Sequence, residues 1–195
     1  MMADGRAARG EHLVWLDLEM TGLDPGSDAI VEMAIAITAL DDFTELETFE
    51  TAIHQPEAVL RQSSDRVLQM HERSGLYGRV RSSPMTIDAA EHAALAVVSR
   101  WCEERQGILA GNSIWQDRRF LERYMPTFEA YLHYRQVDVT SFKVVVRSWY
   151  GPLGVFEKID KSHTALADVR NSIAELDYYR HLFLHGAAHA RRTAP

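Results

Sequence analysis

The amino-acid sequence predicts an α/β protein in which a mixed β-sheet is flanked by helices. Three strand-like segments follow one another near the start of the chain, and their short links favour an antiparallel meander. Helix-like segments and single short strands then alternate, which is typical of a sheet whose later strands are joined through helices. With 195 residues and no internal repeat or linker, the chain fits one domain with a substantial core.

The first strand, residues 13–20, is apolar on both faces except for two carboxylates. Because strand side chains alternate, Asp17 and Glu19 share a face with Leu13 and Trp15. A strand covered on both sides is central in its sheet, and a buried carboxylate must be neutralised, paired or bound to a cation. Turn-forming residues follow, so both acids lie at the carboxyl end of the strand, where open α/β sheets carry their sites. We therefore predict half of a metal site; a surface strand with a charged outer face fits the apolar neighbours less well.

The remaining elements are expected in the following order. Strands at 30–40 and 46–54 complete the meander, and short strands at 108–110 and 136–139 come later. Helices are expected from a cap at Ser64 or Asp65 to a stop near Gly75, from a cap at Thr86 to Gly107, and over 116–124, 128–133, 140–150 and 165–185, the last stopped by Gly186. The domain is expected to span 12–185, with flexible tails at 1–11 and 186–195.

Composition limits the partners that the protein can have. The net charge is −7, with 28 acidic and 21 basic side chains, and no basic stripe suits a long or duplex nucleic acid. Any nucleic-acid substrate should therefore be short or gripped locally. The single cysteine, Cys102, permits no internal disulfide, which suits a reducing compartment. Neither a signal peptide nor a membrane span is recognisable, so we expect a cytoplasmic protein without a membrane partner.

Three more polar residues lie where later segments begin. Asp117 stands at the entrance of a helix, where an N-cap or first-turn acid is the common role. His163 and Asp168 are five residues apart, which is a rotation of about 140° on an ideal helix. They converge only if His163 lies in the loop before the helix. Each residue alone has an ordinary structural explanation, but their combination with the carboxylates of the first strand predicts a shared site.

These segments, in this order, resemble the three motifs of the DEDDh family of 3′-to-5′ exonucleases and, within it, the oligoribonuclease family. The motif segments are Asp17-Leu-Glu19, the run 112–121 around Asp117, and the run 163–168. Connecting segments also match: 16–25, Met70-His71 with 74–76, Tyr134-Arg135, Asp138-Val139 and 175–180. Trp115 and the valine-rich run 142–146 depart from the family pattern. The similarity covers about residues 12–185, and three ordered motifs are a far more specific signal than one D-x-E.

Four carboxylates with one histidine and no cysteine cluster select hard divalent ions, Mg²⁺ or Mn²⁺. The resemblance implies a ribonuclease H-like sheet and two ions per site. It implies that Asp17 bridges both ions, that Glu19 and Asp168 complete one of them, and that Asp117 acts directly or through water. It also implies His163 as the general base, a role that suits the ordinary pKa of histidine. The implied products are nucleoside 5′-monophosphates, released stepwise from the 3′ end.

The resemblance further implies a preference for very short single-stranded RNA, dinucleotides above all. The candidate substrate residues are Leu23 as a wedge between bases with Met20 beside it, His71 stacked on a base, and Ser113, Arg135 and Thr140 around the 5′ phosphate. Tyr134 resembles a residue contributed across a twofold interface, which would make the protein a homodimer. Ordinary roles compete with these: loop packing for Leu23, a helix end for His71 and the core for Tyr134.

Other functions make different predictions. Another DEDDh exonuclease, acting on tRNA 3′ ends or on DNA, would call for basic surface patches that the acidic balance does not suggest. A non-catalytic binding module that keeps the fold predicts the loss of at least one of the five motif residues, and all five are present. A structural metal-binding protein has no use for a histidine base.

Overall fold

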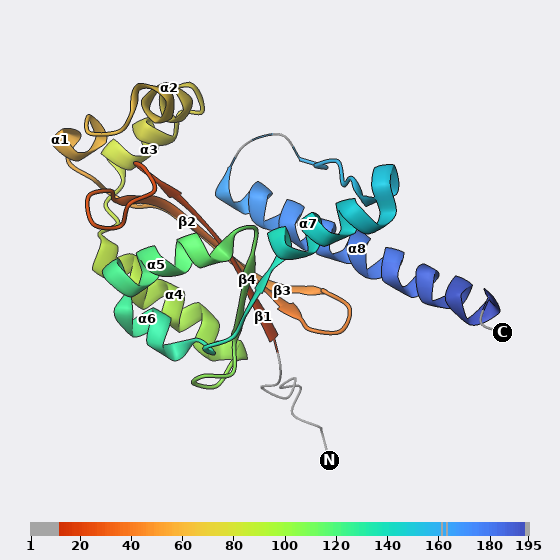
Figure 1. The fold of residues 1–195 in the computed structure, drawn as a ribbon. Helices are drawn as coiled ribbons and strands as arrows, with labels where there is room; N and C mark the ends of the chain where they lie inside the picture. The colour runs from red at the N-terminus through yellow and green to blue at the C-terminus, as the bar shows by residue number, and fades with distance from the viewer. Residues whose placement is uncertain (1–11, 161, 163, 194–195) are drawn as a thin grey trace, which may run out of the picture.

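The computed structural model describes residues 12–160, 162 and 164–193, with side chains through Leu184. Its centre is a five-stranded mixed sheet in the order β3-β2-β1-β4-β5 (Figure 1). The strands are β1 His12–Met20, β2 Ile30–Ala39, β3 Glu45–Ala52, β4 Ile108–Gly111 and β5 Gln136–Asp138. The first three form an antiparallel meander, and β4 and β5 run parallel to β1. The predicted fold class is confirmed.

Strand β1 is central in the sheet and covered on both faces, as its apolar pattern predicts. Val14 and Leu16 belong to the core under one face, whereas Leu13 and Trp15 belong to the core under the other. Asp17, two residues after Trp15, therefore emerges on the same face as that tryptophan. The alternation of the strand thus decides which layer of helices meets the carboxylates.

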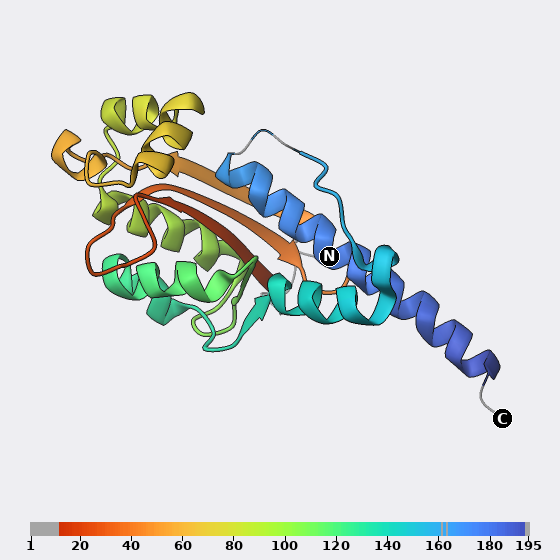
Figure 2. The ribbon, with the colours of Figure 1, turned by 45° about the horizontal axis from the view of Figure 1, so that its top comes forward.

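Eight α-helices and one 3₁₀ helix are present among the described residues. They are α1 Glu57–Leu60, α2 Asp65–Arg73, α3 Leu76–Ser82, α4 Ile87–Trp101, α5 Ile114–Tyr124, α6 Pro126–Tyr131, α7 Val139–Tyr150, η1 Gly151–Gly154 and α8 Ala165–Thr193. Helices α4, α5 and α6 cover one face of the sheet, and α7 and α8 cover the other (Figures 1 and 2). The short helices α1–α3 gather at the end of the sheet where β1 finishes (Figure 1).

Local capping chemistry sets two of the helix starts. Ser64 precedes α2, and its hydroxyl accepts a hydrogen bond from the backbone N–H of Val67. Thr86 precedes α4 and accepts from the N–H of Ala89 at 3.2 Å. Both caps satisfy a backbone donor that the first turn leaves unpaired, and both confirm the sequence prediction.

Three expectations about helices were wrong. Helix α4 ends at Trp101 and not at Gly107, because Cys102 already has extended backbone angles. Helices α1 and α3 were not expected; Gly75, at φ 74°, ends α2 and also serves as the N-cap of α3. Helix α8 continues past Gly186 to Thr193. A helical glycine costs only about 1 kcal/mol relative to alanine, and the alanines that follow favour the helix. That residues 12–185 form one domain stays a prediction, and residues 1–11 lie outside the described residues.

None of the helices in the described part of the chain combines the length and the apolar character needed to cross a bilayer.

Candidate active site

Three carboxylates meet at the carboxyl end of β1. Asp17 and Glu19 come from the strand, and Asp168 comes from the first turn of α8. One oxygen of each lies within 4.8 Å of the others. The β1–β2 register shifts between Glu19 and Met20, and a bulge at a strand end commonly re-aims side chains at a site. The fold thus joins acids that are about 150 positions apart in sequence, as the motifs predicted.

The fourth predicted acid, Asp117, lies in the first turn of α5 and is almost fully buried. Its Oδ1 accepts a hydrogen bond from the backbone N–H of Leu18 at 2.9 Å. Leu18 stands between Asp17 and Glu19, so Asp117 is tied to the strand that carries both. It is therefore more than a first-turn acid at a surface helix end.

The electrostatics of the site favour a cation. Burial is the main cause that raises the pKa of Asp17 well above its usual range, and the charges of Asp117, Glu19 and Asp168 add to it. Burial first, then the neighbouring Glu32, raises the pKa of Glu19 to about 7. Burial also raises the pKa of Asp117 to about 7. Acids held together at this cost fit a bound divalent cation, which supplies the missing positive charge to oxygen ligands.

Lys158 is a site residue that the sequence analysis missed. Its ammonium lies 2.5 Å from Oδ1 of Asp168. The loop that carries it is fixed to α8, because Oδ1 of Asn171 accepts hydrogen bonds from the N–H groups of Ile159 and Asp160. A lysine in a loop has no periodicity to reveal it. The predicted base, His163, lies outside the described residues.

A second group of polar side chains, the Asn112 group, lies next to the carboxylates. The amide of Asn112, at the end of β4, donates to Ser172 and Glu175 on α8. Its oxygen accepts from Thr140 and from Lys143, both on α7. Lys143 also pairs with Glu175 at 3.1 Å. A cavity of about 320 Å³ joins this group to the carboxylates; it is lined by Asp17, Leu18, Glu19, Asn112, Lys143, Lys158, Asp168, Asn171 and Ser172.

The loop that follows β1 presents Leu23 to solvent, with 71% of the residue exposed. Its backbone is held from both sides. The side chain of Gln116 donates to the Leu23 carbonyl at 2.6 Å, and the hydroxyl of Thr21 donates to the carboxylate of Asp28 and accepts from the N–H of Ala29. Met20, at the end of the strand, is half-buried. Leu23 is thus an exposed leucine on a loop with a fixed backbone, and its role as a wedge between bases stays a prediction.

His71, in contrast, is only 2% exposed. Its Nε2 donates to the carbonyl of Met20 at 3.1 Å and lies 3.9 Å from Oε2 of Glu19. The ring packs against Tyr77 with centroids 5.0 Å apart. Burial lowers the pKa of His71 and favours its neutral form. The ring is therefore next to the carboxylates, and its stacking on a base stays a prediction.

Ser113 and Thr140 meet where α5 and α7 begin. Ser113 has left-handed backbone angles, with φ 53°. Its N–H donates to Oδ1 of Asp138 at 3.0 Å and to the hydroxyl of Thr140 at 2.9 Å. The two hydroxyls are 3.1 Å apart. The guanidinium of Arg135, the third predicted phosphate ligand, lies instead over the ring of Tyr134, 5.3 Å from its centroid.

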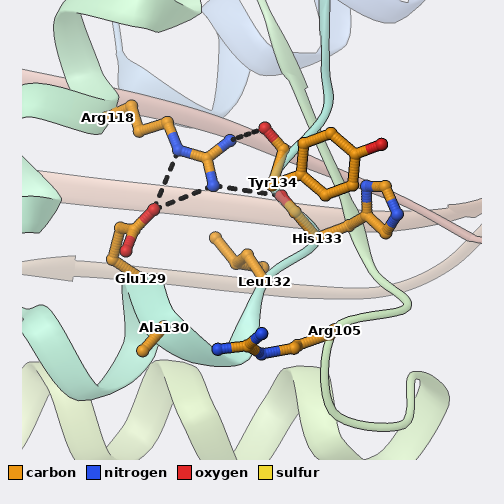
Figure 3. Close-up of a pocket in the computed structure, with 7 residues that line it drawn as sticks. All are labelled: Arg105, Arg118, Glu129, Ala130, Leu132, His133 and Tyr134. Atoms are coloured by element: carbon orange, nitrogen blue, oxygen red, sulfur yellow. Dashed lines mark hydrogen bonds and ion pairs between the residues drawn. The ribbon is translucent and has the colours of Figure 1, made fainter.

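Tyr134 is 74% exposed, so the alternative of a core residue is wrong. Figure 3 shows Arg118 beside it: the guanidinium donates to the carbonyls of Tyr134 and His133 and pairs with Glu129. These residues border a cavity of about 460 Å³. Arg118 thus fixes the backbone of the segment from which the tyrosine projects.

Comparison with known proteins agrees with this geometry. The family model described as exonuclease matches residues 14–176. An oligoribonuclease from an Azoarcus species is 46% identical over 175 residues, which is 89% of this chain and 95% of that protein. An oligoribonuclease from Pseudomonas aeruginosa is 44% identical over 89% of this chain and 97% of its own length.

Among solved structures, cell-death related nuclease 4 superposes with a TM-score of 0.66 at 15% identity, over 90% of this chain and 65% of the other. That likeness concerns the fold, whereas the family model and the curated relatives cover most of the chain at much higher identity. The chain belongs to the exonuclease family and, within it, to the oligoribonucleases.

Proposed function

We propose that this protein is a 3′-to-5′ exoribonuclease that degrades short oligoribonucleotides, dinucleotides above all, to nucleoside 5′-monophosphates. The observation that carries the proposal is the convergence of Asp17, Glu19 and Asp168 within 4.8 Å, with Asp117 beside them. Family membership supports the same reaction.

The four acids hold two divalent ions, Mg²⁺ or Mn²⁺, in this proposal. Asp17, Glu19 and Asp168, whose oxygens lie within 4.8 Å of one another, would hold the ions, and Asp117 would act directly or through water. Carboxylate oxygens without sulfur ligands suit either ion. When bound, the ions stabilise the charge that develops on the attacking and departing oxygens of an in-line phosphoryl displacement.

The proton chemistry is assigned to His163, which precedes Asp168 by five residues. It takes a proton from the water that attacks phosphorus. The bond between phosphorus and the 3′ oxygen then breaks, which releases a nucleoside 5′-monophosphate and a chain shortened by one nucleotide. A positioned base contributes roughly 10²–10⁴-fold to such a step.

Substrate length is set, we infer, by residues other than the four acids. Leu23 separates two bases with Met20 next to it, and His71 adds a stacking face. Ser113 and Thr140 bind the 5′ phosphate with hydroxyls that already lie together, and Arg135 adds a charge-assisted contact after turning from Tyr134. A site closed at the 5′ end admits a dinucleotide and disfavours a long strand.

We further propose a homodimer in which Tyr134 of each protomer completes the site of its partner. The exposure of the tyrosine and the fixation of its backbone by Arg118 support a contact outside the protomer. A cytoplasmic location is also proposed, because the chain has one cysteine, Cys102, whose thiol is free and buried.

The decisive experiment compares 5′-labelled RNA of different lengths in Mg²⁺: a dinucleotide, a pentanucleotide and a strand of twenty nucleotides. We expect rapid cleavage of the dinucleotide, slow attack on the long strand and near silence from His163→Ala. Equal rates on all lengths would contradict the proposal of a site closed at the 5′ end, while exonuclease activity itself would stand. A tRNA 3′ end or a DNA strand cleaved faster than the dinucleotide would favour the other DEDDh activities.

A further inference from the structure

Glu32 is a buried acid to which the proposed reaction assigns no role. It lies on β2 directly opposite Glu19 of β1, and it is 1% exposed. Residues that face each other across an antiparallel pair share a face of the sheet and have close Cβ atoms. The sheet therefore places a second glutamate immediately beside a proposed metal ligand, where it repels the charge of that ligand.

The carboxylate of Glu32 joins two helices to the sheet. Oε1 lies 2.5 Å from Nη1 of Arg79 on α3. Oε2 accepts a long hydrogen bond, 3.4 Å, from the backbone N–H of Ala165. Ala165 is the first residue of α8, and Asp168 follows in the same turn. One side chain thus touches the strand pair that carries Glu19 and the helix end that carries Asp168.

Arg79 makes this arrangement tolerable. A buried carboxylate beside another acid is strongly unfavourable unless a cation compensates it. Arg79 is only half-buried, so its charge stays partly solvated while one nitrogen reaches Glu32. Its helix is anchored independently, because Leu76, Tyr77 and Val80 of α3 pack with Val31 of β2.

We propose that the Arg79–Glu32 ion pair is a positioning device for the metal centre: it fixes the first turn of α8 against β2 so that Asp168 and Glu19 reach the same ion. The proposal rests on the metal site of the proposed function. Glu32 and Arg79 are positioning residues, since neither contacts the cavity between the carboxylates. Groups that orient metal ligands from behind affect metal affinity by roughly 10–100-fold.

The test measures Mn²⁺ binding in the absence of RNA, by the rise in melting temperature as Mn²⁺ is added. For Arg79→Gln and Glu32→Gln we expect the Mn²⁺ midpoint to increase roughly 10-fold or more. Arg79→Lys, which keeps a charge but loses the planar donor set, should give a smaller increase. Combining Arg79→Gln with Glu32→Gln should add little to either change alone, because both remove the same interaction.

Arg170→Gln is the matched control. Arg170 also lies on α8 and pairs with a strand residue, Glu45, but this pair is far along the sheet from Glu19. The control should lower the metal-free melting temperature as the test variants do and leave the Mn²⁺ midpoint unchanged. With a dinucleotide substrate, Arg79→Gln should have a lower kcat than the wild type at low Mn²⁺. Its kcat should return to the wild-type value at high Mn²⁺, and its KM for the dinucleotide should be unchanged.

Equal midpoints in the wild type, Arg79→Gln and Arg170→Gln would overturn the inference and reduce the pair to a structural contact. A wild type that shows no Mn²⁺ midpoint at all would instead overturn the metal site of the proposed function. The two failures are therefore distinguishable in one titration.

Discussion

At the scale of single residues, the buried acids of this site lower the folding stability of the metal-free protein. Folding raises the pKa of Asp117 from 3.8 to about 7, chiefly through burial. An acid whose pKa is raised binds its proton more tightly when folded, so its contribution to stability is full below pH 3.8 and is lost as the pH rises through about 7. The linkage relation puts the loss at roughly 4 kcal/mol for such a shift. The metal-free protein should therefore be less stable at pH 8 than at pH 5.

The Asp117→Asn substitution tests this cost. Its amide oxygen can still accept from the N–H of Leu18, while the buried charge is gone. In EDTA, the variant should gain stability relative to the wild type at pH 8, by one to a few kcal/mol, and gain little at pH 5. Urea unfolding at both pH values measures the difference. Asp88→Asn, at an exposed first-turn acid of α4, is the control, and a gain for Asp117→Asn that is equal at both pH values would contradict the prediction.

Lys158 occupies the place of a cation beside Asp168. Lys158→Met should lower the Mn²⁺ midpoint, because the metal then displaces no ammonium and meets one positive charge fewer. The lysine is about half-exposed, so its pair is worth at most about 1 kcal/mol, which is roughly a 5-fold change. Calorimetric titration with Mn²⁺ measures it, with Arg61→Gln, at the C-cap of α1, as a surface-pair control. A higher midpoint would mean that Lys158 helps to hold the site.

At the scale of elements, the loop after β1 depends on a close approach of Gly22 to Asp28. A Cβ at Gly22 would lie 2.4 Å from a carboxylate oxygen of Asp28. That carboxylate receives the hydroxyl of Thr21 and the N–H of Asp24, so it cannot move without opening the loop. The element that presents Leu23 is therefore fixed by a contact that only glycine allows.

Gly22→Ala should disturb this loop and leave the sheet intact. We expect a loss of about 1–3 kcal/mol in unfolding free energy and a several-fold higher KM for a dinucleotide, because Leu23 is no longer held. Thermal unfolding and steady-state kinetics measure the two effects. Gly26→Ala in the same loop is the control, since its Cβ would meet Asp24 at 3.2 Å and at the surface. Similar KM values for the two variants would argue against a fixed wedge.

At the scale of the whole molecule, the proposed dimer makes a prediction about mixed protomers. Tyr134→Ala leaves the carboxylates intact, and Asp17→Asn leaves the tyrosine intact. If each tyrosine serves the partner, a mixed dimer contains one complete site. Refolding the two weakly active variants together at equal amounts should then restore about a quarter of wild-type activity, since half of the dimers are mixed and each has one complete site.

Dinucleotide hydrolysis and sedimentation of the mixture measure the outcome. Each variant refolded alone is the control. No recovery from a mixture that sediments as dimers would show that Tyr134 does not act across the interface.

The sequence by itself determined the strands, the face on which Asp17 and Glu19 lie, and the cap of α4 at Thr86. These follow from alternation and capping, which depend on residues within one or two turns of each other. The convergence of Asp168 with the strand acids was also foreseen, but through the order of the motifs and the family resemblance, since no local rule joins positions so far apart.

Only the tertiary structure decided the pairing of Lys158 with Asp168, the Asn112 group and the contact of Glu32 with Arg79. Helix α3, which carries Arg79, has no strong pattern in the sequence and is held by packing against Val31. Helix α8 likewise continues beyond Gly186. The weak tendency of a glycine to end a helix is outweighed there by the helix that surrounds it. Contacts between distant segments depend on where the sheet places them, and that placement is a property of the assembled core rather than of any stretch of chain.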